Sequence, residues 1–117
     1  MKIIRNGGNE VIFESKHKTM KATVVAALKK DADLCGADLR YANLCGANLG
    51  DADLDFSVFP LWCGAFRIKA DLRLAAQLAY HFCRIDFQDC EEAKKAQEAI
   101  KDLANKFHRV DECGKIE

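Results

Sequence analysis

Between Ala32 and Phe56 the apolar positions recur every five residues, a period that fits neither an α-helix nor a flat strand. The stretch reads ADLCGADLRYANLCGANLGDADLDF, in which alanine, then aspartate or asparagine, then leucine are followed by two variable residues. A coil that turns after every fifth residue would explain this period. The repeat therefore predicts a solenoid segment in the middle of the chain.

The words ADLCG, ADLRY, ANLCG, ANLGD and ADLDF resemble the pentapeptide repeat family, whose fold is the right-handed quadrilateral β-helix. The resemblance implies that four words form one square coil, with the alanine and leucine of each word pointing inward. Coils about 4.8 Å apart would stack residue n on residue n+20, which places Phe59 in a leucine position over Leu39. Pro60 would end the repeat after about one and a half coils. The expected repeat core is Ala32, Leu34, Ala37, Leu39, Ala42, Leu44, Ala47, Leu49, Ala52, Leu54 and Phe59.

The residues before the repeat predict a hairpin and a helix. KII and VIF are short apolar runs on either side of the turn sequence NGGN, which is typical of a β-hairpin. Thr19 can cap a helix that ends near Lys29 and Lys30, where cations suit the helix dipole. So short a solenoid needs caps, and we expect these two elements to cover its first end.

Two helical patterns follow the repeat. Asp71 can cap a helix that runs to about Arg84, with an apolar stripe made of Leu72, Ala75, Leu78, Ala79 and Phe82. DCEE at residues 89–92 resembles a capping box, and apolar residues follow in helical order as far as His108. We predict two antiparallel helices that pack on the second end of the coil. Their sequence is similar to the tails of uncharacterised bacterial and phage pentapeptide-repeat proteins, a resemblance that implies no particular activity.

These elements together predict a mixed β-helix and α fold. In the fold that the resemblance implies, a short right-handed quadrilateral β-helix of about 1.5 coils would be capped by an N-terminal hairpin and helix and by a C-terminal helical pair. The expected division is 1–30 for the hairpin and capping helix, 31–60 for the β-helix and 61–117 for the helical region. All three parts are expected to form one compact domain.

The charge changes sign where the repeat begins, although the 117-residue chain has a net charge of +0. Residues 1–30 carry seven basic against two acidic side chains, and residues 31–56 carry one basic against six acidic ones. A neutral chain gives no field that would attract nucleic acid or an anionic membrane. The start MKIIRNGGNEV lacks the apolar core of a signal peptide, so we expect a cytoplasmic protein with reduced cysteines.

The candidate chemical groups do not form a convincing reactive site. The six cysteines include no CxxC pair, and the spacing of the cysteines and histidines is unsuited to known zinc sites. His81 and Cys83 could pair as base and nucleophile, but positions i and i+2 diverge on a helix. We therefore expect a protein that is not an enzyme, with no catalytic residues, no metal and no cofactor.

Three kinds of function remain. The first is a non-enzymatic interaction or scaffold module whose partner is another protein or a second copy, with dimerisation through the C-terminal end of the coil. The second is a phage-encoded protein that sequesters a small ligand or inhibits the host through a pocket between coil and helices. The third, a minor alternative, is a DNA-mimicking inhibitor or protector of DNA gyrase, which the short acidic stretch disfavours.

The predicted partner or ligand surface is spread over the C-terminal half of the chain. Trp62 either fills an apolar joint or contacts the partner, and His108 with Arg109 either binds an anion or neutralises a helix end. The complete predicted surface is Trp62, Phe66, Arg67, His81, His108 and Arg109.

Overall fold

A computed structural model describes residues 1–117 and divides the chain into two compact units, Met1–Ala70 and Asp71–Glu117. The first unit extends ten residues beyond the boundary predicted after residue 60. The regular elements are one two-stranded sheet, a 3-10 turn and five α-helices. None of these helices is both long enough and apolar enough to span a membrane.

The predicted N-terminal hairpin is present. Strands β1 (Lys2–Ile4) and β2 (Val11–Glu14) pair antiparallel, with Ile3 opposite Phe13. The hairpin continues into the repeat, because the backbone N–H of Asp38 donates to the carbonyl oxygen of Ile4 at 2.8 Å. Ile3 is fully buried, so the hairpin contributes an apolar side chain to the core of this unit.

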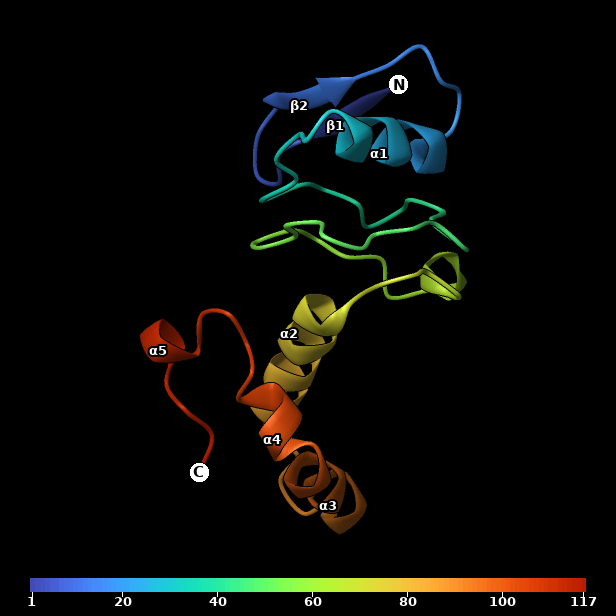
Figure 1. Ribbon diagram of the computed structural model, residues 1–117. Coiled ribbons are helices and arrows are strands. Elements are labelled where there is room, and N and C mark those ends of the chain that lie inside the picture. The colour runs from blue at the N-terminus through green and yellow to red at the C-terminus, as the bar shows by residue number, and fades with distance from the viewer. The chain divides into compact units, whose positions relative to one another are not determined.

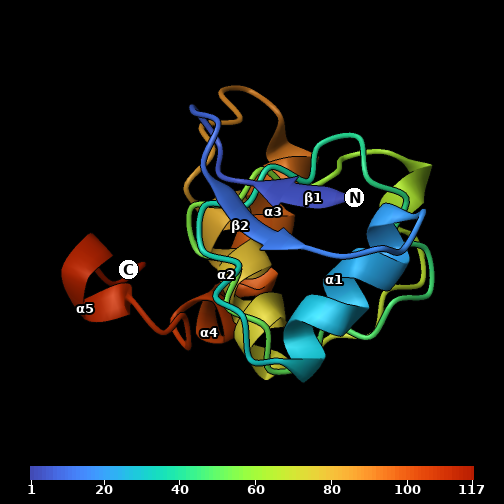
Figure 2. The same ribbon diagram turned by 90° about the horizontal axis from the view of Figure 1, so that it is seen from above.

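Helix α1 (Met20–Lys29) begins where the sequence predicts. The Thr19 hydroxyl accepts a hydrogen bond from the Ala22 backbone N–H at 3.1 Å, which satisfies one free donor of the first turn. Val24 and Ala27 are completely buried. Figures 1 and 2 place this helix beside the hairpin, with the repeat directly below both.

Each word of the repeat ends in a tight turn. The backbone N–H that opens one word donates to the leucine carbonyl oxygen of the word before it. These bonds join Ala37 to Leu34, Ala42 to Leu39, Ala47 to Leu44, Ala52 to Leu49 and Ser57 to Leu54, at 2.8–3.2 Å. Four of the five turns place a residue with positive φ before the next word: Gly36, Gly46, Asp51 and Phe56. The five-residue period is therefore an extended segment followed by a turn.

The aspartate or asparagine of each word holds its own turn. Its side-chain Oδ1 accepts the backbone N–H two residues further on, the Asx arrangement that short polar side chains favour. The pairs are Asp33 with Cys35, Asp38 with Arg40, Asn43 with Cys45, Asn48 with Gly50 and Asp53 with Asp55, at 2.9–3.3 Å. The second position of the word is thus polar for an architectural reason.

Successive windings of the repeat are hydrogen-bonded to each other. Parallel bridges join Asp38 to Val58, twenty residues apart, and Asn48 to Lys69, twenty-one apart. The prediction that Pro60 ends the coil is wrong, because this pairing continues to Lys69. The change in spacing shows that one extra residue is accommodated between the two bridges, and such an irregularity tolerates proline. In Figure 2 the two windings, teal and green, follow nearly the same outline.

The inward positions of the repeat form the core of the first unit. The five leucines are buried with at most 5% of their surface exposed, as are four of the five alanines with at most 8%, whereas Ala32 and Phe59 are half-buried. These segments form isolated β-bridges but no regular strands, because the only sheet is that of the hairpin. Alternation of small and large side chains therefore fills the centre of the windings.

The second unit begins with helix α2 (Leu72–Cys83), and Asp71 caps it as predicted by accepting the Leu74 backbone N–H at 3.3 Å. The predicted apolar stripe is wrong at three of its five positions, since Ala79 is buried and Phe82 is half-buried as expected. Leu72, Ala75 and Leu78 are exposed, and the buried residues of the helix are Leu74, Ala76, Ala79 and Tyr80. Because LRLAAQLAYHF carries apolar residues around the whole helix, periodicity alone could not choose the face.

The predicted second helix is divided into shorter ones. Helix α3 (Glu91–Ala99) is followed by α4 (Lys101–Ala104) and, after a turn, by α5 (Val110–Cys113). The predicted capping box is wrong, because Cys90 is the N-cap and makes no side-chain cap bond. Ile100 separates α3 from α4, and its side chain packs on the core of the unit. Tertiary packing has here overridden a continuous helical pattern.

The core of the second unit is built around two stacked rings. Tyr80 and Phe107 have ring centroids 4.7 Å apart, and Ala79 and Ala104 are buried beside them. The Tyr80 hydroxyl donates to the Gly114 carbonyl oxygen at 2.6 Å, which fixes the C-terminal segment. Figure 1 shows α4 lying against α2.

Candidate functional site

An exposed apolar surface lies at a turn of the repeat, where residues of two successive windings line one hollow. Tyr41, Leu61 and Trp62 are 87%, 96% and 46% exposed, and together with Arg40 they line a hollow of ≈ 440 Å³. Tyr41 and Leu61 are twenty positions apart in the chain, and both line this hollow. We call these four residues the corner patch. Tyr, Trp and Arg are the residue types that dominate the energetics of protein interfaces.

The Trp62 ring packs directly on the backbone of Gly64, which has no side chain to block it. Gly64 is buried, and a Cβ added there would overlap the indole and lie 2.9 Å from the Ala42 carbonyl oxygen. The Gly64 carbonyl oxygen in turn accepts the Leu44 backbone N–H at 2.7 Å. Trp62 is therefore supported from below by the paired windings, and its position is set by the coil.

Arg40 of the corner patch forms an ion pair with Asp38, which lies beside the patch. Arg40 donates to both carboxylate oxygens of Asp38, with Nη2 2.7 Å from Oδ2 and Nε 2.9 Å from Oδ1. Those hydrogen bonds lower the pKa of Asp38 and raise the pKa of Arg40. The Arg40 guanidinium also lies over the Tyr41 ring, 5.9 Å from its centroid. The patch thus combines apolar side chains with one guanidinium, whose charge the neighbouring Asp38 balances.

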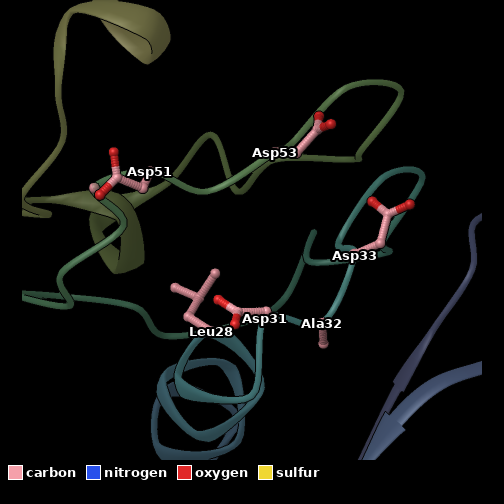
Figure 3. A pocket seen from close by; sticks show the side chains of 7 residues that line it. Leu28, Asp31, Ala32, Asp33, Asp51 and Asp53 are labelled. Carbon is pink, nitrogen blue, oxygen red and sulfur yellow. The ribbon is translucent and has the colours of Figure 1, made fainter.

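A second hollow, of ≈ 490 Å³, is acidic. It lies at the end of α1, where Leu28 and Ala32 meet four aspartates: Asp31, Asp33, Asp51 and Asp53. Figure 3 shows Asp33 and Asp53 on neighbouring windings and Asp31 beside Leu28. Asp33 and Asp53 also hold their own turns through Oδ1. Within the chain, no group of three or more histidine, cysteine, aspartate or glutamate side chains is placed to hold a metal ion.

The residues of the predicted partner surface fall in both units. Trp62, Phe66 and Arg67 belong to the first unit, where Phe66 is 61% exposed and Arg67 has a φ of 60° at a turn. Trp62 belongs to the corner patch, whereas the lining of its hollow does not include Phe66 or Arg67. The sequence-based surface omits Tyr41 and assigns Leu61 to an apolar joint, although their twenty-residue spacing could have identified them.

The other three residues of the predicted surface belong to the second unit. His81 and His108 both lie beside Phe107, with ring centroids 6.0 Å and 4.9 Å from it. Arg109 donates to Glu112 through Nη2 at 2.6 Å. Two of the three are therefore neighbours of the aromatic core, and Arg109 forms a local ion pair.

The cysteines are free thiols. Cys63, Cys90 and Cys113 are exposed, while Cys35, Cys45 and Cys83 are half-buried. Burial raises the pKa of Cys35 and of Cys83, and nearby aspartates raise that of Cys35 further. A raised pKa disfavours the thiolate, which is the nucleophilic form. Neither thiol is thus activated for chemistry.

Comparisons with known proteins agree with the geometry of the repeat. No curated protein and no solved structure matches the chain. Residues 30–59 match the family model described as pentapeptide repeats (8 copies). The matched stretch covers the turn-forming words and ends one residue before Pro60, and it is the part of this chain that is similar to that family.

Proposed function

We propose that this protein is a non-enzymatic interaction module, in which a short right-handed quadrilateral β-helix displays the corner patch to a partner protein. The family match and the parallel bridges about twenty residues apart support such a coil. The repeat itself is architectural, because its leucines fill the interior and its aspartates and asparagines hold the turns.

The corner patch carries the proposal. Leu61 and Tyr41 expose nearly their whole side chains, although burial of such side chains away from water is favourable. They are gathered with Trp62 around one hollow, and clustering of this kind is typical of binding surfaces. The support of Trp62 by Gly64 means that the aromatic anchor is held in place before a partner arrives.

Affinity enrichment with a matched pair of variants tests this function. The wild type, Leu61→Asp and Leu72→Asp are immobilised, and the proteins that each retains from an extract of the producing cell are quantified by mass spectrometry. Leu72 is also an exposed leucine, 57% accessible, but it lies at the start of α2 in the other unit. We expect a partner that is retained by the wild type and Leu72→Asp and lost with Leu61→Asp. Equal retention by all three proteins would overturn the proposal.

A further inference from the structure

We infer that the corner patch is self-complementary and that its occupant is the corner patch of a second copy of this chain. This inference rests on the proposed function and names its partner. It follows from the shape, the charge and the area of the patch.

The shape provides a projection and a recess on the same surface. Leu61 is 96% exposed, and the hollow that it borders with Tyr41 and Trp62 measures ≈ 440 Å³. A two-fold axis through the patch would bring each Leu61 over the hollow of the other copy. Interfaces between identical copies are commonly of this isologous kind, in which one patch meets itself.

The charges allow the same arrangement. Asp38 and Arg40 lie side by side, with 27% and 48% of their side chains exposed. A two-fold axis would place Arg40 of one copy near Asp38 of the other. Each guanidinium could then form ion pairs with the Asp38 carboxylates of both copies. The chain as a whole carries a net charge of +0, so two copies do not repel through an excess of one sign.

The area indicates a reversible dimer. Aromatic side chains bury about 150–250 Å² each, and Tyr41 is almost fully exposed whereas Trp62 is about half exposed, so with Leu61 they offer roughly 450 Å² per copy. Two copies would bury about 900 Å² through these side chains, close to the lower limit of specific interfaces. We expect a dissociation constant on the order of 10–100 µM.

The sole tryptophan of the chain reports directly on this contact. Sedimentation velocity and tryptophan emission are recorded for the full chain from about 1 to 500 µM. The wild type should change from monomer to dimer, and its emission should move to shorter wavelength over the same concentrations as Trp62 leaves water. Leu61→Asp should weaken the dimer about 30-fold or more, the loss typical of a central interface residue. Leu72→Asp should dimerise like the wild type.

Two results would overturn the inference. The first is a wild type that stays monomeric up to the highest concentration. The second is a dimer that persists in Leu61→Asp with unchanged tryptophan emission, because that dimer would use another surface. In either case, a different protein retained by the wild type and lost with Leu61→Asp would leave the proposed function standing. Circular dichroism of both variants verifies that they are folded.

Discussion

Trp62 lies so close to Gly64 that a Cβ at Gly64 would be 2.6 Å from Cε2 of the indole. Gly64→Ala should therefore displace the ring or the backbone and lower the free energy of unfolding by about 1–3 kcal/mol, as overpacking does. Urea unfolding followed by circular dichroism measures this loss. Gly8→Ala is the control, since an added Cβ there has nothing within 4 Å. Equal stability of Gly64→Ala and the wild type would show that Trp62 is not seated on this glycine.

The leucines of the repeat should carry much of the stability of the first unit. Leu44 is fully buried, and Leu44→Ala should cost about 2–5 kcal/mol through lost burial and a cavity. Leu61→Ala makes the same chemical change at a site that is 96% exposed, so it should stay within about 0.5 kcal/mol of the wild type. Parallel chemical denaturation of the two variants measures the difference. Similar losses would contradict an inward-facing core.

The Asx turns give a third prediction. Asp33→Ala removes the acceptor of the Cys35 backbone N–H and should lower the free energy of unfolding by about 0.5–1.5 kcal/mol. Asp33→Asn keeps an oxygen at the same place and should remain close to the wild type. Thermal unfolding of the pair distinguishes the hydrogen bond from the charge. The explanation fails if the asparagine variant loses as much stability as the alanine variant.

The pH dependence of stability should contain a contribution from Asp38. Hydrogen bonds from Arg40 lower the pKa of Asp38 below its ordinary value of 3.8. Since the folded-state pKa is the lower one, this stabilisation is present above about pH 4 and is lost as the pH falls through the folded-state value. The stability difference between the wild type and Asp38→Asn should shrink below pH 4. Urea titrations from pH 7 to pH 2 measure it, and a constant difference would argue against the pair.

Much of the architecture could be predicted because local sequence signals determined it. The NGGN turn, the Thr19 and Asp71 caps and the five-residue words each specify a local conformation, and the structure contains all of them. The end of the coil could not be predicted in this way. Whether Pro60 ends a winding depends on hydrogen bonds to a winding twenty residues earlier, and proline does not encode that information.

The second unit was harder to predict because several of its features are determined by tertiary packing and not by local sequence. The buried face of α2 and the break at Ile100 are both set by packing around Tyr80 and Phe107. The corner patch was recognised only in part, through Trp62. Tyr41 was an ordinary variable position of a repeat word until the winding brought it beside Leu61.

The central claim is that this protein acts through the corner patch, and photo-crosslinking from Tyr41 tests it most directly. A benzophenone amino acid is placed at Tyr41 or, as a control, at Phe56, an aromatic residue that is 70% exposed outside the patch. Irradiation in the producing cells should yield a discrete crosslinked polypeptide from Tyr41 and none from Phe56, and Leu61→Asp should remove it. A species of twice the chain mass would identify a second copy, and any other mass a different partner. The same products from both positions, or none from Tyr41, would contradict the account.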